Sequence, residues 1–292
     1  MGTEGLLAGR YRLDHVAGHG GMATVFAAYD TVLDRTVAIK LLQRRHDATG
    51  MLHARFEREA RAEAKIVHPN VVSVHDIGES DDGRPFIVMD YVEGRSLQDV
   101  VAEDGPLDSE HTALVGMGVA RALAAAHALG IVHRDVKPAN VIVDPQGLPH
   151  LMDFGLARAA DGDNDAALTA PGILLGTAHY VAPEQARYGQ GSPRGDLYSL
   201  GAVLYYALTG TPPFDGDGAI DVALRRFEED PADLRTLLPA ADPELAALIH
   251  ALLARTPDDR PSEATAVAER LINVAARLRA TRTAGETQEP LS

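Results

Sequence analysis

The 292-residue sequence contains no cysteine and no tryptophan, and only 5% of its residues are aromatic. Without cysteine, a disulfide framework, a thiolate metal site and a thiol nucleophile are all excluded. This composition fits a reducing cytosol, and we expect a cytoplasmic location. The core must be packed mainly with aliphatic side chains, which favours many helices.

Positive charge and long apolar runs are also scarce. The chain has 27 Lys and Arg against 42 Asp and Glu, a formal net charge of −15. Nucleic acid and anionic membranes repel such a surface, so we expect no nucleic-acid partner. No apolar run reaches the roughly 18 residues of a membrane span, and no signal peptide is recognisable at the start, so we expect no span within this chain. A local cationic pocket for a phosphate is compatible with this charge.

The order of strand and helix patterns predicts an α+β fold with two lobes. The predicted strands are residues 11–16, 24–29, 36–42, 71–77 and 85–92, and the predicted helices are residues 51–67, 108–130, 196–208, 220–229, 243–254 and 261–278. Asp108 is the expected N-cap of the second helix. We therefore expect one domain over residues 1–279. It comprises a small five-stranded lobe at about 11–88, a hinge at 89–94, a larger helical lobe at 95–279, and a disordered tail at 280–292.

A glycine-rich turn and a strand lysine are the first chemical signals. Gly18-His19-Gly20-Gly21 lies between two predicted strands, where the backbone can approach phosphates closely. A glycine-rich hairpin turn explains the segment equally well. The third strand contains Val37-Ala38-Ile39-Lys40, and only three of the 27 basic residues are lysine: Lys40, Lys65 and Lys137. The chain uses arginine almost everywhere else. A lysine inside a motif therefore indicates a position that requires a compact ammonium group.

Three further motifs follow in a fixed order. They are His133-Arg134-Asp135-Val136-Lys137-Pro138-Ala139-Asn140, then Asp153-Phe154-Gly155, then Ala182-Pro183-Glu184. These motifs follow the glycine-rich turn and the strand lysine in the chain. With this order of motifs, the chain resembles bacterial eukaryotic-like (Hanks-type) serine/threonine protein kinases over about residues 10–275. The resemblance implies an enzyme that transfers the γ-phosphate of ATP to serine or threonine hydroxyls of proteins, using Mg²⁺ or, as a substitute, Mn²⁺.

The resemblance also implies a role for each matching residue. Asp135 would orient the substrate hydroxyl, Lys137 would neutralise the γ-phosphate, and Asn140 and Asp153 would hold the metal. Lys40 would contact the α- and β-phosphates and pair with a helix carboxylate, for which we choose Glu59 and leave Glu57 and Glu63 as competitors. The implied ATP-binding residues are Gly18, His19, Gly20, Gly21, Val25, Ala38, Lys40, Met89, Asp90, Tyr91, Val92 and Ile142.

Structural support and regulation follow from the same resemblance. Arg134 would lie beside the activation segment, Thr177 would contact the catalytic aspartate, Asp196 would tie down the catalytic loop, and Glu184 would form a buried ion pair with Arg260. Thr169 is the expected autophosphorylation site, with an unmodified loop threonine as the alternative. Glu63 departs from the family pattern, because an apolar residue usually stands there, and we expect the carboxylate to favour an outward, inactive helix.

Other readings remain open. A pseudokinase that acts as a signalling scaffold would normally lack Lys40, Asp135 or Asp153, and all three are present. A small-molecule phosphotransferase would usually lack Ala182-Pro183-Glu184. Related domains often form homodimers through the small lobe, and many are the cytosolic part of a membrane-anchored receptor kinase. Both arrangements are compatible with this sequence.

Overall fold

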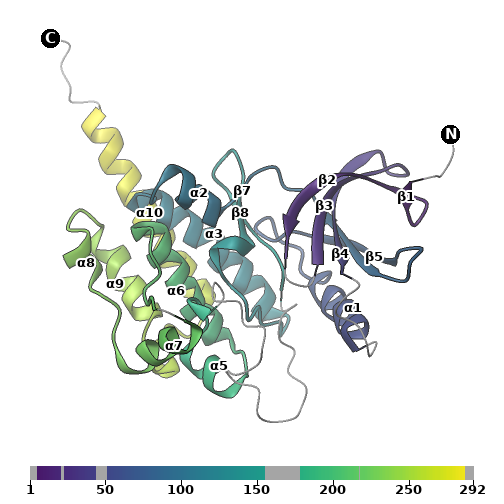
Figure 1. Cartoon of the computed structure of the whole chain (residues 1–292). Coiled ribbons are helices and arrows are strands. Elements are labelled where there is room, and N and C mark those ends of the chain that lie inside the picture. Colours follow the sequence, from purple (N-terminus) through teal and green to yellow (C-terminus); the bar gives the residue numbers. More distant parts are fainter. Residues whose placement is uncertain (1–4, 21–22, 44–50, 155–177, 217, 287–292) are drawn as a thin grey trace. The chain divides into compact units, whose positions relative to one another are not determined.

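The structure is a computed structural model that describes residues 5–20, 23–43, 51–154, 178–216 and 218–286. Predictions for Gly21, Thr169 and Thr177 lie outside the described residues, and the side chain of Glu59 is likewise not described. The chain divides into two compact units, Met1–Glu93 and Gly94–Ser292 (Figure 1). Their boundary falls within the segment that we predicted to be the hinge.

The described part of the first unit contains a six-stranded antiparallel sheet and one helix. Its elements are β1 (Leu6–Leu7), β2 (Tyr11–His19), β3 (Ala23–Asp30), β4 (Arg35–Leu42), α1 (Met51–Glu63), β5 (Val74–Glu79) and β6 (Pro85–Asp90), with the strands in the order β1-β2-β3-β4-β6-β5. The five predicted strands are confirmed, with shifted ends. β1 was missed because two residues carry no periodicity, and α1 ends four residues earlier than predicted.

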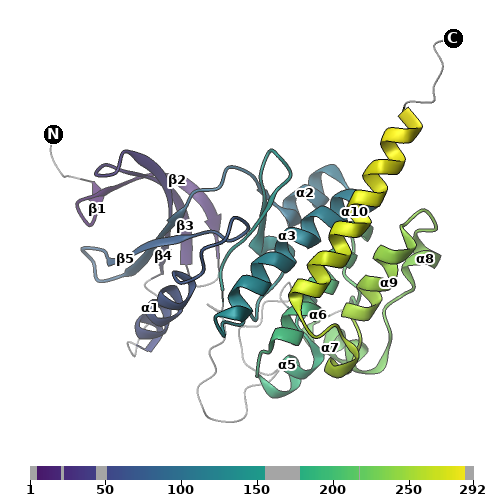
Figure 2. The same ribbon diagram turned by 180° about the vertical axis from the view of Figure 1, so that it is seen from behind.

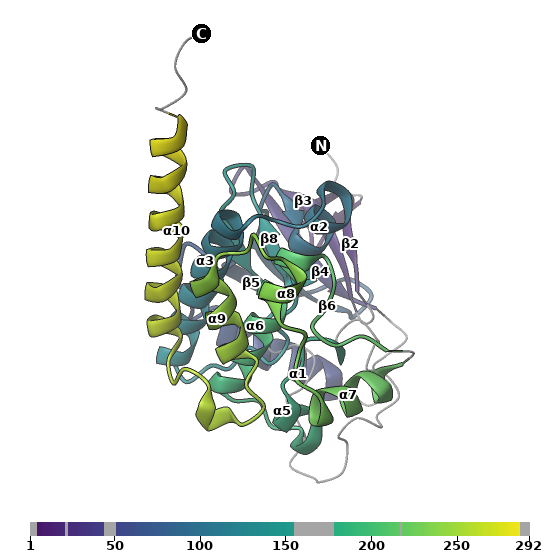
Figure 3. The same ribbon diagram turned by 90° about the vertical axis from the view of Figure 1, so that its left-hand side faces the viewer.

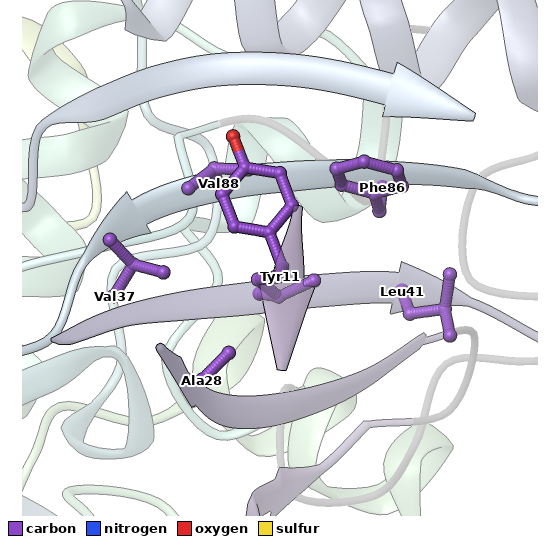
Figure 4. Packing of buried hydrophobic residues seen from close by; sticks show 7 residues of the cluster. Tyr11, Ala28, Val37, Leu41, Phe86 and Val88 are labelled. Atoms are coloured by element: carbon purple, nitrogen blue, oxygen red, sulfur yellow. The ribbon is translucent and has the colours of Figure 1, made fainter. Parts of the chain in front are cut away.

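Alternation along β4 separates the two faces of this sheet. Val37, Ile39 and Leu41 are at most 4% exposed and pack with side chains from β2, β3 and β6 in one hydrophobic cluster (Figure 4). Since successive side chains of a strand point to opposite faces, Ala38 and Lys40 lie on the other face. Because the apolar cluster occupies one face of the sheet, the candidate site residues are those of the other face, including Ala38 and Lys40.

The second unit is mainly helical. Its helices are α2 (Leu97–Asp104), α3 (Ser109–Ala128), α5 (Pro183–Tyr188), α6 (Pro193–Thr209), α7 (Ala219–Glu228), α8 (Leu234–Leu237), α9 (Pro243–Leu252) and α10 (Ala264–Glu286), with short 3₁₀ turns η2 (Pro138–Asn140) and η3 (Pro257–Asp259). A small sheet has the order β7-β8-β9 and consists of β7 (Arg95–Ser96), β8 (Val141–Val143) and β9 (Pro149–Leu151). The two-lobed α+β fold that we predicted is thus confirmed.

Local signals set the ends of the long helices. Asp108 caps α3 as predicted, and its side chain accepts a hydrogen bond from the His111 amide at 2.8 Å. Ser192 caps α6 in the same way, and Gly210 ends α6 in a left-handed conformation. Most residues of α6 are buried, and α3 packs between α6 and α10 (Figure 2).

The C-terminal helix corrects one prediction. We expected a disordered tail from residue 280, but α10 continues to Glu286 (Figure 3). Arg277 donates to Asp242 at 2.8 and 3.0 Å, and Arg282 lies 2.9 Å from the buried carboxylate of Glu110. These contacts reach the N-terminal ends of α9 and α3 and explain why a polar sequence stays helical there. None of the helices in the described ranges is long and apolar enough to cross a membrane.

Candidate active site

The loop that precedes η2 is fixed by one buried carboxylate. Asp196, which is 1% exposed, accepts hydrogen bonds from the backbone amides of His133 at 2.9 Å and Arg134 at 2.8 Å. The ring of His127 adds a third contact at 2.8 Å. Arg134 has a φ of 68°, a strained value for a non-glycine residue that needs such support. The first turn of α6 thus determines the backbone path of this loop.

Asp135 lies at the centre of the site. Lys137 Nζ donates to Asp135 Oδ2 at 2.7 Å, and Asn140 Nδ2 donates to the same oxygen at 3.1 Å and to the Asp135 carbonyl at 2.8 Å. The Asp135 side chain is 12% exposed. A carboxylate held in this way can accept a hydroxyl proton, and the ammonium beside it can neutralise a phosphoryl group.

His133 joins this loop to the segment that carries Asp153. Its Nδ1 accepts from the Asp135 amide at 3.2 Å, so the proton lies on Nε2, which donates to the Met152 carbonyl at 3.0 Å. Burial lowers the pKa of His133 and keeps the ring neutral. The ring also packs on Phe154 with centroids 4.5 Å apart. Asp153 lies between Met152 and Phe154, which both contact His133, and it has a φ of 65°.

Asn140 and Asp153 carry oxygen atoms of the kind that a hard cation prefers. The Asn140 amide nitrogen is used towards Asp135, which leaves its Oδ1 as an acceptor. The Met152 amide donates to the Asn140 carbonyl at 3.0 Å, so the backbones that carry the two ligands are directly linked. One amide oxygen and one carboxylate suit Mg²⁺, which usually completes its shell with water and substrate phosphate.

In the first unit, strand register brings the predicted nucleotide residues to one face of the sheet. Val25 is the cross-strand partner of Lys40, and Ala38 is the partner of Met89. Partners directly opposite each other share a face, so these four residues line the face opposite the hydrophobic cluster. Gly18 lies opposite Val25 at the turn end of the β2–β3 hairpin.

The remaining predicted residues are placed as follows. The described part of the glycine-rich turn closes with Gly20 N donating to Ala23 O at 2.9 Å. His19 ends β2, Tyr91 and Val92 follow β6, and Ile142 lies on β8 of the second unit. Glu63 is only 4% exposed, so this unusual carboxylate is buried and not solvated.

The hinge residue Asp90 has a partner that sequence reasoning missed. A β-bulge places His75 between the ladder pairs of Val74 and Asp76, and His75 Nε2 lies 2.5 Å from Asp90 Oδ1. The Ser73 amide donates to the other carboxylate oxygen at 3.3 Å. Burial opposes ionisation of Asp90, but these hydrogen bonds outweigh it and hold the pKa of Asp90 below its usual value. The sequence around His75 and Asp76 contains no pattern that would have indicated this bulge.

Glu184 and Arg260 form the ion pair that the sequence suggested. Arg260 NH1 and NH2 donate to Glu184 Oε1 and Oε2 at 2.7 and 2.8 Å, a bidentate geometry. The other donors of Arg260 reach the carbonyls of Ala254, Arg194 and Arg255 at 2.7 to 3.1 Å. All five N–H groups are satisfied, and the Arg260 side chain has no exposed surface.

Two supporting residues carried no recognised sequence signal. His127 ends α3 and reaches Asp196, and Gln185 on α5 donates from Nε2 to the Arg134 carbonyl at 2.8 Å. A histidine in the last turn of a helix reads as a simple dipole partner, so its tertiary role was hidden. Gln185 follows Ala182-Pro183-Glu184 directly, and that position was the available clue.

Comparison with known proteins agrees with this geometry. A model of the protein kinase domain matches residues 11–272. A probable serine/threonine-protein kinase of Corynebacterium efficiens is 41% identical over 270 residues, which cover 90% of this chain and 41% of that protein. The serine/threonine-protein kinase PknB of Mycolicibacterium smegmatis is 41% identical over 278 residues, covering 94% of this chain and 44% of that protein. The chain thus spans about two fifths of the length of these relatives.

Among solved structures, the kinase domain of PknI from Mycobacterium tuberculosis superposes with a TM-score of 0.72 at 28% sequence identity, covering 94% of this chain and 99% of that one. The family model spans most of the chain, and both sequence relatives align over nine tenths of it or more. The chain therefore belongs to the protein kinase family, in its bacterial serine/threonine branch, as we predicted from the order of its motifs.

Proposed function

We propose that this domain transfers the γ-phosphate of ATP to serine and threonine hydroxyls of proteins. The observation that carries this proposal is the cluster around Asp135, where Lys137 and Asn140 both bind the same carboxylate oxygen. One oxygen of the carboxylate is thereby held, and the other can accept a hydrogen bond from an incoming hydroxyl. Phosphoryl transfer needs mainly such positioning and charge neutralisation.

Residues of the first unit would bind the nucleotide. Lys40 supplies an ammonium group for the α- and β-phosphates, with Glu59 as its proposed carboxylate partner. Val25 and Ala38 offer apolar surface for adenine, and the backbone of residues 90–92 offers its hydrogen-bonding groups. Gly18, His19, Gly20 and Gly21 would cover the phosphates with backbone amides.

Asn140 and Asp153 would hold Mg²⁺, for which Mn²⁺ can substitute. The bound ion would neutralise charge on the β- and γ-phosphate oxygens. The protein's part is to keep both oxygen ligands on linked backbone segments, which the Met152–Asn140 hydrogen bond does.

Regulation and partners form part of the proposal. Thr169 is the proposed autophosphorylation site, and a phosphate there would pair with Arg134. A homodimer would form through the small lobe, where Val32 and Leu33 are 69% and 54% exposed. The domain would act in the cytoplasm, where ATP is supplied, as a free enzyme or as part of a membrane-anchored kinase; nucleic acid is not among the proposed partners.

Intact-mass measurement tests the central proposal. The purified chain is incubated with ATP and Mg²⁺ beside an Asp135→Asn variant, and we expect phosphate-sized mass steps only in the unmodified chain. Peptide mapping then locates the modified residue. If phosphate appears only at residues other than Thr169, the regulatory site is wrong. If neither protein gains mass or transfers phosphate to casein, although ATP and Mg²⁺ raise the melting temperature, the catalytic proposal is wrong and a nucleotide-binding scaffold is supported.

A further inference from the structure

A second buried arginine lies in the large unit, and its surroundings differ sharply from those of Arg260. Arg226 on α7 is 2% exposed, and among the described residues its one hydrogen bond goes from NH2 to the Ala178 carbonyl. Its Nε is buried without a partner, as is the hydroxyl of Tyr198. Within the ranges that the structure describes, no carboxylate pairs with Arg226.

Such an environment is unfavourable for a guanidinium. Arg260 is equally buried, but it meets a carboxylate and satisfies all five donors. Arg226 lacks both compensations, and burial lowers its pKa. Replacing a buried, uncompensated charge by an apolar side chain of similar length is usually neutral or stabilising. Arg226 is therefore poorly explained as a stabilising residue.

The contact that Arg226 does make leads towards the catalytic loop. Ala178 is 3% exposed and stands five residues before Pro183, the first residue of α5. On α5, Gln185 donates to the carbonyl of Arg134, the neighbour of Asp135. Helices α5 and α7 lie side by side in the large unit (Figures 1 and 2). Two hydrogen bonds and one short backbone segment thus join α7 to the loop that carries Asp135.

We propose that Arg226 is a positioning residue for phosphoryl transfer: by donating to the Ala178 carbonyl, it holds residues 178–182 in the conformation that transfer to a protein acceptor requires. This inference rests on the proposed kinase function. It goes beyond that function because Arg226 lies outside the motifs that define the active site. The role is one of orientation, since the contact that Arg226 makes is with a backbone carbonyl.

The test compares two neighbouring arginines of the same helix. Arg226→Met removes the buried guanidinium, while Arg225→Met removes a guanidinium that is 47% exposed and lies 3.4 Å from Asp221. Arg226→Lys restores a donor for the carbonyl. Melting temperature, the dissociation constant for ATP, and kcat and KM for transfer to casein are measured for each protein. Hydrogen exchange is followed in the peptide that covers residues 178–188.

We expect Arg226→Met to melt at the same temperature as the unmodified chain or a few degrees higher. Its kcat should fall about tenfold to a hundredfold, as expected for a displaced reacting geometry, with ATP affinity unchanged. Exchange in the 178–188 peptide should accelerate. Arg226→Lys should recover part of kcat, and Arg225→Met should leave all five measured quantities unchanged.

Two results overturn the inference while leaving the proposed function intact. One is an Arg226→Met variant that keeps full kcat. The other is a variant whose activity falls only in proportion to a lowered melting temperature, which is the behaviour of a purely structural residue. An unmodified chain that transfers no phosphate to casein or to itself overturns the proposed function, and the positioning role with it.

Discussion

Neutralising Glu184 should destabilise the large unit far more than neutralising an exposed carboxylate. In Glu184→Gln, one oxygen that accepts from Arg260 becomes an NH₂ group pointing at another donor. The guanidinium then remains buried without its counter-charge. Breaking a buried ion pair from one side costs about 3–5 kcal/mol. Asp258 is a matched control, because it pairs with Arg194 but is 86% exposed, and Asp258→Asn should cost less than about 1 kcal/mol.

The double-mutant cycle gives the sharper measurement. Arg260→Met leaves three carbonyls without their donor, each at a cost of about 1–3 kcal/mol if it stays buried. In Glu184→Gln with Arg260→Met, the uncompensated guanidinium is gone, so the total should be smaller than the sum of the single changes. We expect a coupling energy of about 2 kcal/mol.

Urea unfolding at pH 7 is the assay. Circular dichroism and the emission of the eight tyrosines report the transition, since the chain has no tryptophan. A Glu184→Gln variant whose unfolding free energy falls by less than about 1 kcal/mol, like the Asp258 control, would refute the argument that burial controls the cost of this pair.

Three further changes test the site and its support. Asp196→Ala removes the acceptor for two buried amides of the catalytic loop, and we expect a loss of about 2–5 kcal/mol in urea unfolding with undetectable transfer to casein. Gly94→Ala places a Cβ against the Val143 carbonyl, and overpacking should cost about 1–3 kcal/mol in the same assay. Two hydrogen bonds from Arg10 lower the pKa of Asp30 to about 2, so its stabilisation is complete above about pH 4 and is lost as the pH falls towards 2. The melting temperature of Asp30→Asn should therefore lie below that of the unmodified chain at pH 7, and the two should converge near pH 2.

Local patterns were sufficient for most of the fold. Period-two runs and glycine turns located the five main strands of the first unit, and a capping aspartate located the start of α3. Helix α1 was drawn too long because residues 64–67 continue its composition, although the backbone turns after Glu63. Strands β1 and β7 have two residues each, and such pairs carry no periodic signal.

What sequence reasoning missed depends on partners that are distant in the chain. Residues 280–286 read as a polar tail, because the carboxylates that meet α10 come from Glu110, Asp242 and Glu244. The burial of Glu63, where the sequence departs from the family pattern, could be seen only in the structure. In the sequence, Arg226 resembles a surface arginine of an amphipathic helix, because the adjacent residues do not indicate that its side chain is buried.

The motif residues were found more readily than their supports. A kinase motif fixes the order of Asp135, Lys137 and Asn140, and local geometry then brings their side chains together within one turn. Their supports, His127 and Gln185, act through contacts 51 to 69 positions apart in the chain. Chain order therefore predicts the reacting groups, whereas the groups that orient them appear only when the helices are packed.

The attachment of the catalytic loop to α6 has a consequence for how activity is lost on heating. Asp196 belongs to the first turn of the most deeply buried helix of the large unit, and it holds two consecutive amides of the loop. The loop is thus part of the same cooperative block as the core, unlike surface loops that open independently. Thermal inactivation should accordingly be as steep as global unfolding of the large unit and should not precede it.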